Sequence, residues 1–123
     1  MSTTELVVDI QDIEFCLFEW LQVDQLQQYP KYADYDTETL NLLVTEGLKF
    51  AKEVISPTNM EADREGCTVV DGNATVPQCL QNPYKQAYEL GWSSITASQE
   101  FGGQGAPEAI GLALSEGILG GNL

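Results

Sequence analysis

The stretch "SQEFGGQGAP", residues 98–107, places Gly102, Gly103 and Gly105 within four positions, between two segments of helical pattern. Glycine permits phosphate binding, a tight turn or close contact between two backbones. A phosphate loop requires GxxxxGK[ST], and no lysine lies near this stretch. The glycine spacing also differs from the GxGxxG of dinucleotide-binding loops. We therefore expect no nucleotide site but a tight turn, through which the last helix folds back on the helix that ends at Gly91.

The composition indicates one globular domain with an acidic surface. The chain has 123 residues, of which 43% are hydrophobic and 20% are charged, an ordinary globular balance. Nineteen acidic residues face five basic ones, no histidine is present, and the net charge is −14. Such a charge repels nucleic acid and anionic lipid, so we expect neither a nucleic-acid partner nor a membrane partner.

Three cysteines, Cys16, Cys67 and Cys79, form no CxxC pair, and no histidine exists to complete a zinc site. The start "MSTTELVVDI" has no export-signal pattern, and no apolar run is long enough to span a bilayer. These features predict a cytoplasmic protein with reduced thiols and no metal site. Packing or chance placement explains the cysteines better than reactivity.

The first part of the chain predicts a helix followed by an irregular segment. Residues 9–23, "DIQDIEFCLFEWLQV", carry apolar side chains at helical spacing, with Asp9 or Asp12 as the N-cap. Residues 24–35 contain Pro30 and predict an irregular crossing segment.

The clearest helix begins after Asp36, a typical N-cap residue. Pro57 should kink or end this helix, because proline removes a backbone donor and crowds the preceding turn. Residues 58–66 predict a second, more exposed helix. The apolar face of the first helix comprises Leu40, Leu43, Val44, Gly47, Phe50, Ala51, Val54 and Ile55.

Residues 67–77 predict a β-hairpin that turns at Asp71, Gly72 and Asn73. A lone hairpin is marginally stable, so we expect it to lie against the helices. The next predicted helix has Asn82 as N-cap, Pro83 as first residue, Gly91 past its end, and Tyr84, Ala87 and Tyr88 facing inward.

The last predicted helix, "PEAIGLALSEGILGGNL" at residues 107–123, is apolar almost all round. Ile110, Leu114 and Ile118 share one face, while Leu112 and Leu119 leave little of the helix polar. We expect it to be buried on most sides. The fold class is therefore all-α, an incomplete helical bundle with one small β-hairpin.

In combination, these motifs resemble the N-terminal helical domain of acyl-CoA dehydrogenases over residues 9–123. The stretch "SQEFGGQGAP" resembles that family's [PS]-x-E-[YF]-G-G-x-G-x-P turn, with "YELGW" before it and "SEGILGGN" after it. "FAKEVISPTNMEADREGC" is similar to the family's FA-x-E-x-(I/L)-x-P-x-N helix. "DIEFCLFEWL" is similar to the N-terminal extension of the branch that acts on 3-methylmercaptopropionyl-CoA and similar thioesters.

The resemblance implies a truncated enzyme. Residues 1–34 would form the extension helix and crossing segment, and residues 35–123 a partial N-terminal helical domain. The family's longer members hold FAD between a β-barrel-like middle domain and a C-terminal four-helix domain. A glutamate, usually from that last domain, serves as base, and an electron-transfer flavoprotein accepts the electrons. We therefore expect this chain to bind no FAD and to have no turnover by itself.

Glu116 is a candidate catalytic base by its chemistry, but the resemblance places it on a structural helix. No residue is assigned a catalytic, cofactor-binding or metal-binding role. Two hypotheses stay open. In one, the chain is the N-terminal part of a dehydrogenase and pairs with the missing middle and C-terminal domains. In the other, it is a non-catalytic helical interaction module or remnant, and its last helix drives formation of a homo-oligomer.

Overall fold

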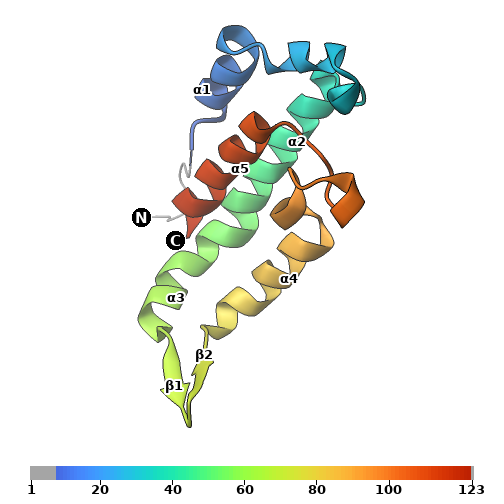
Figure 1. Cartoon of the computed structure of the whole chain (residues 1–123). Coiled ribbons are helices and arrows are strands. Elements are labelled where there is room, and N and C mark those ends of the chain that lie inside the picture. The colour runs from blue at the N-terminus through green and yellow to red at the C-terminus, as the bar shows by residue number, and fades with distance from the viewer. Residues whose placement is uncertain (1–7, 123) are drawn as a thin grey trace.

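Helices dominate residues 8–122, which are the residues that the computed structural model describes (Figure 1). None of these helices is long and apolar enough to cross a membrane. The chain start "MSTTELV" and Leu123 lie outside the described residues. The predicted all-α fold with one small hairpin is confirmed. Its elements are α1 (Ile10–Glu14), α2 (Thr37–Phe50), α3 (Asn59–Glu65), β1 (Thr68–Val70), β2 (Asn73–Thr75), α4 (Gln81–Glu89) and α5 (Glu108–Gly121).

Helices α2 and α3 form one long, interrupted spine (Figure 1). The carboxylate of Asp36 accepts a hydrogen bond from the Thr39 backbone N–H at 2.8 Å, which confirms the predicted N-cap. After α2 the helix widens to a π-helical turn over Ala51–Ile55 and then tightens to a 3-10 turn over Ser56–Thr58. The predicted disturbance at Pro57 and the second helix after it are both confirmed.

The core lies where α5 packs along α2. Leu40 and Val44 of α2 and Ile110 of α5 have no exposed surface. Ile13 and Leu17 join the same apolar cluster from the N-terminal helix. Most of the predicted apolar face of α2 is buried, and Leu48 joins it.

Paired glycines set the distance between α2 and α5. A Cβ on Gly47 would lie 2.3 Å from a Leu114 methyl carbon, and one on Gly117 would lie 2.5 Å from a Leu48 methyl carbon. Each helix therefore offers a glycine where the other presents a leucine. This arrangement lets the backbones approach closely and fills the space with two buried side chains.

The glycine turn packs as predicted, but the last helix lies on a different partner. A Cβ on Gly103 would lie 2.1 Å from the Ala97 carbonyl oxygen. Gly102 and Gly105 have φ values of +82° and +66°, which side chains rarely adopt. The expectation that α5 folds back on α4 is wrong: it packs along α2 and the π-helical turn after it. The physical reason is the glycine–leucine complementarity between α2 and α5.

The N-terminal helix is shorter and less regular than predicted. Asp9 caps α1 by accepting a hydrogen bond from the Gln11 N–H at 2.9 Å. From Phe15 to Trp20 the helix becomes π-helical, and 3-10 turns at Val23–Gln28 and Pro30–Tyr32 form the crossing segment. The segment is tied to the glycine turn, because the Tyr35 hydroxyl donates a hydrogen bond to the Gln104 carbonyl.

The hairpin forms as predicted but does not pack against the helices. Asp71 and Gly72, with φ values of +51° and +77°, make the turn, and Asn73 already belongs to β2. Every residue of both strands is exposed, and the hairpin extends away from the helices (Figure 1). The expected packing is therefore wrong. Gly66, at φ +65°, ends α3 and redirects the chain outward.

Helix α4 is rotated relative to the prediction. It begins at Gln81 after a 3-10 turn, so Asn82 is not the N-cap, and Pro83 lies buried in the first turn. Tyr84 and Tyr88 are 65% and 60% exposed, and their rings contact each other at a tilt of 51°, so their expected inward position is wrong. Burial of Pro83 turns the tyrosines toward solvent. Gly91 follows the helix at φ +81°, as predicted.

Replacing Gly103 with valine should destabilise the fold, because the side chain would collide with the backbone of residue 97. We expect a loss of at least about 2 kcal/mol in the free energy of unfolding. Gly72→Asn is the matched control, because nothing lies near that position and asparagine tolerates positive φ. Urea unfolding of both variants measures the difference. Equal stability of Gly103→Val and the natural chain would contradict the tight turn.

Acidification should weaken the start of α2. Hydrogen bonds from Thr39 lower the pKa of Asp36. The stabilisation is therefore present above the carboxyl's unfolded-state pKa and is lost as pH falls through the lowered folded-state pKa. Asp36→Asn keeps a capping oxygen that does not titrate, so its melting temperature should fall less on acidification than that of the natural chain. Asp34→Asn is the control. Parallel pH profiles for all three proteins would contradict this account.

Candidate binding surface

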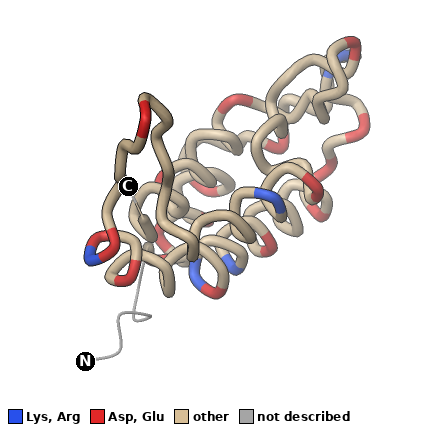
Figure 2. The backbone as a smooth tube through the Cα atoms, turned by 90° about the horizontal axis from the view of Figure 1, so that it is seen from below, with Lys and Arg blue, Asp and Glu red and all other residues tan. Residues whose placement is uncertain are grey.

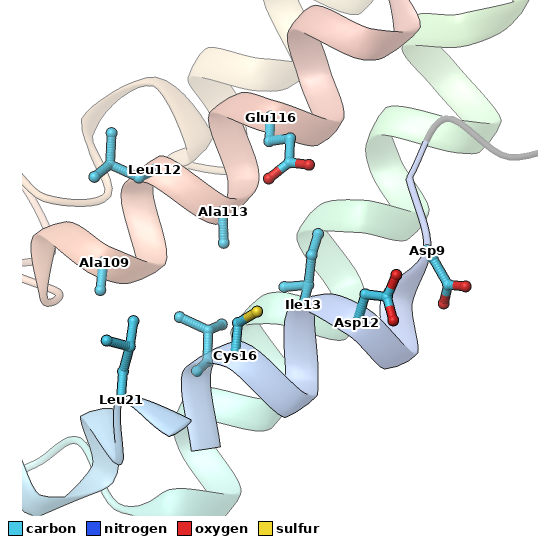
Figure 3. A pocket seen from close by; sticks show the side chains of 10 residues that line it. Asp9, Asp12, Ile13, Cys16, Leu21, Ala109, Leu112, Ala113 and Glu116 are labelled. Atoms are coloured by element: carbon cyan, nitrogen blue, oxygen red, sulfur yellow. The ribbon is translucent and has the colours of Figure 1, made fainter. Parts of the chain in front are cut away.

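A groove of about 360 Å³ lies between α1 and α5 (Figure 3). The helices supply its walls, and the small side chains of Ala109 and Ala113 leave it open on the α5 side. Its lining residues are Asp9, Asp12, Ile13, Cys16, Leu17, Leu21, Ala109, Leu112, Ala113 and Glu116.

The polarity of the groove changes along its length. The two helices run in opposite directions, so Asp9 and Asp12 of the α1 segment lie toward the same end as Glu116 of α5 (Figure 3). Leu21 and Ala109 lie toward the other end. Among the described residues, no lysine or arginine lines the groove. This arrangement suits a ligand that is apolar over most of its length and cationic at one end.

The outer face of α5 is exposed, contrary to the expectation of burial on most sides. Leu112 is 70% exposed and Leu119 is 55% exposed. A second hollow of about 180 Å³ lies across Leu112 from the groove, between α5 and the segment around Trp92 and Thr96. Leu112 lines both hollows and so stands as a ridge between them. Within residues 8–122 no other element covers this ridge.

The surface around these hollows is strongly acidic. Carboxylates outnumber basic side chains along the whole backbone tube (Figure 2). Over the described part of the chain, the one ion pair joins Lys85 to Glu89 at 3.7 Å. The carboxylates at the groove end therefore have no basic partner there.

Trp92 forms the wall of the second hollow. Its ring lies 6.4 Å from that of Phe50, and its indole N–H is buried without an acceptor among the described residues. An unmet buried donor lowers stability by about 1–3 kcal/mol. The ring is thus retained for packing, at the expense of one hydrogen bond.

The glycine turn does not fit a dinucleotide. The backbone N–H groups of Gly102, Gly103, Gln104 and Gly105 donate hydrogen bonds to the carbonyl oxygens of Gln99, Ser98, Ser94 and Ala97, at 2.9–3.2 Å. None of these N–H groups is therefore available to a phosphate. This turn therefore does not form a site for the pyrophosphate of FAD.

Other residues considered from the sequence do not gather into a reactive centre. Glu116 is exposed on α5 at the acidic end of the groove. Cys16, Cys67 and Cys79 are free thiols on separate segments. Desolvation raises the pKa of the Cys79 thiol, and the carboxylates of Glu61 and Glu65 raise it further, so this thiol is protonated at neutral pH. Between residues 8 and 122 no three metal-ligating side chains come together.

Sequence reasoning missed the groove. A signal was present in the pair of small residues Ala109 and Ala113, which share one face of a helix at i and i+4. That pattern indicates either a close helix contact or a hollow. Only the structure distinguishes them, because the side chains of α1 do not fill the space.

Comparison with known proteins supports the resemblance. No protein-family model matches the chain. It is 30% identical over 110 residues to 3-methylmercaptopropionyl-CoA dehydrogenase of Ruegeria pomeroyi, covering 87% of this chain and 18% of the relative. It is 28% identical over 117 residues to the broad-specificity linear acyl-CoA dehydrogenase FadE5 of Mycobacterium tuberculosis, covering 93% of this chain and 19% of the relative. It is 28% identical over 95 residues to a butyryl-CoA dehydrogenase of Syntrophomonas wolfei, covering 74% of this chain and 16% of the relative.

The homologues over most of this chain are thus acyl-CoA dehydrogenases, as the resemblance predicted. The chain spans less than a fifth of the length of these curated relatives. Homology and the helical fold together agree with an N-terminal part of that family.

Replacing Trp92 tests the unmet indole donor. Trp92→Phe removes the N–H and keeps an aromatic ring against Phe50, so stability should change by less than about 1 kcal/mol. Trp92→Ala also removes the packing and should lower the free energy of unfolding by about 3 kcal/mol. Chemical denaturation distinguishes the two. A phenylalanine variant as unstable as the alanine variant would show that the N–H has an acceptor.

Proposed function

We propose that this chain forms the N-terminal helical part of a flavin-dependent acyl-CoA dehydrogenase. The main observation in its support is homology to acyl-CoA dehydrogenases over 74–93% of this chain. The matched region makes up less than a fifth of each of those enzymes. In this proposal residues 35–123 are the partial helical domain, and residues 1–34 are the extension helix and crossing segment. The full enzyme would act in the cytoplasm and pass electrons to an electron-transfer flavoprotein.

The chemistry of the described residues supports a structural role. Oxidation of an acyl-CoA thioester needs a base at the α-carbon, hydrogen-bond donors at the thioester carbonyl and a flavin at the β-carbon. The described residues that line the groove between α1 and α5 offer apolar side chains and carboxylates but no convergent donors. The glycine turn uses its own N–H groups internally. We therefore assign the flavin site and the base to the rest of the enzyme.

Isolation of the protein that bears this sequence from its own cells tests the proposal. We expect a species with flavin absorbance, a mass several times that of this chain, and acyl-CoA-dependent reduction of a dye. The recombinant 123-residue chain is the matched control and should be colourless and without turnover. A colourless native species, or a flavin-bound active 123-residue chain, would contradict the proposal.

A non-catalytic interaction module is the second candidate function. The observation that favours it is the exposure of Leu112 and Leu119 on α5, where Leu112 also lines an open, mostly apolar groove. Contiguous apolar surface of this kind marks binding surfaces in soluble proteins. Isolation from cells distinguishes the two functions. The interaction module would carry no flavin and would be purified as a monomer, as a homo-oligomer or together with a protein unrelated to dehydrogenases.

A further inference from the structure

Asp71 is the one aspartate of the sequence that is followed by glycine, and no asparagine is followed by glycine. An aspartate side chain can react with the backbone nitrogen of the next residue, and it reacts fastest before glycine, because no Cβ shields that nitrogen. Apart from its chain neighbours, nothing lies within 4 Å of the position that a Cβ on Gly72 would take. Among residues 8–122 the Gly72 N–H also has no backbone acceptor. The Gly72 nitrogen is therefore open to the Asp71 carboxyl group.

The closed turn holds these two groups in an unreactive arrangement. Asp71 and Gly72 have φ values of +51° and +77°, the left-handed conformations of a two-residue type I′ turn. To reach the carboxyl carbon, the Gly72 nitrogen must rotate about the Cα–C bond of Asp71, and this rotation takes Asp71 out of the turn conformation. Pairing of Val70 with Asn73 opposes the rotation. The reaction therefore needs the hairpin to open.

Little holds the hairpin closed. Its strands pair over three residues each, every residue of both strands is exposed, and the hairpin extends away from the helices (Figure 1). A two-stranded hairpin without a packing surface is marginally stable in water. The core lies between α2 and α5, away from the hairpin, so the turn can open while the rest of the fold stays intact.

We propose that Asp71 is a site of spontaneous isomerisation to isoaspartate, and that opening of the hairpin sets its rate. The Gly72 nitrogen attacks the side-chain carboxyl carbon of Asp71 and forms a five-membered succinimide. The N–H proton and the carboxyl hydroxyl leave as one water molecule. Water then adds to one of the two ring carbonyls, which restores aspartate at one carbonyl and yields isoaspartate at the other. The product has the mass and the charge of the original chain.

Isomerisation changes the backbone of the turn. The main chain then runs to Gly72 through the former side chain of Asp71, so the turn contains one additional backbone atom. A type I′ turn requires two ordinary residues, so the pairing of Val70 with Asn73 is lost and the hairpin stays open. The helices keep their packing. Isomerisation needs only the turn and its opening, so it is independent of the proposed dehydrogenase role.

Incubation of the 123-residue chain at neutral pH and physiological temperature tests the proposal. A synthetic peptide of residues 65–85, the tryptic peptide that contains the turn, serves as the fully open reference. When half of this peptide has isomerised, the chain is digested with trypsin, and electron-transfer fragmentation distinguishes aspartate from isoaspartate. We expect isoaspartate at residue 71, formed at most about 10-fold more slowly than in the peptide, which corresponds to an opening free energy of about 1.4 kcal/mol.

Two controls isolate the chemistry of the Asp-Gly pair. Asp63 is exposed on α3 but is followed by Arg64, so it should gain no isoaspartate over the same time. The synthetic peptide with Gly72→Val has a shielded nitrogen and no fold to disturb. It should stay unmodified while the natural peptide reacts.

A variant of the strands tests the dependence on opening. The Thr68 and Thr75 hydroxyls hydrogen-bond across the two strands. Thr68→Ala removes this contact, so the chain should isomerise about 2- to 5-fold faster, because the pair no longer favours the closed hairpin. Thr45→Ala is the matched control on α2, where the side chain is exposed, and should leave the rate unchanged. Circular dichroism checks that both variants keep the helical fold.

Three results would overturn the proposal. They are an absence of isoaspartate at residue 71 when half of the peptide has reacted, an equal amount of isoaspartate at Asp63, and equal rates in the Thr68→Ala and Thr45→Ala chains. The last result would show that opening of the hairpin does not set the rate. The dehydrogenase role is judged separately by flavin content, so failure of one proposal leaves the other testable.

Discussion

The structure depends on the close contact between α2 and α5. Gly47 lies against Leu114 and Gly117 lies against Leu48, so each helix accepts a leucine where it has no side chain of its own. This contact buries Leu40, Val44 and Ile110 completely and forms the surface on which Ile13 and Leu17 pack. Close packing of this kind tolerates little change, because a larger residue at either glycine would have to displace a buried leucine.

The sequence predicted the elements of this fold well and their packing less well. Local chemistry determines where helices start and where turns form, so Asp36 and the turn at Asp71 and Gly72 were identified correctly, and Asp9 was one of the two N-cap candidates for the first helix. The partner of α5 is decided by long-range fit, which no local pattern contains. The same limit applies to α4, where burial of Pro83 turned Tyr84 and Tyr88 outward.

The candidate surface was only partly predictable for the same reason. The apolar character of residues 107–123 predicted a helix buried on most sides, and the structure instead leaves one face of α5 exposed. Burial on one side by α2 and exposure of Leu112 on the other follow from the arrangement of three helices. The groove requires α1 and α5 to lie side by side, and these helices are almost a hundred residues apart in the sequence. The apparent excess of apolar residues on α5 is thus divided between a buried core face and an exposed face.

Hydrogen exchange of the isolated chain tests most directly whether the α2–α5 contact organises the molecule. The slowest-exchanging amides should lie in α2 and α5, where the buried residues are concentrated, because the most protected amides open only on global unfolding. The hairpin at residues 68–75, exposed along both strands, should exchange fastest among the regular elements. If α5 exchanges as fast as the hairpin, the contact between α2 and α5 does not hold the fold together and this account is wrong.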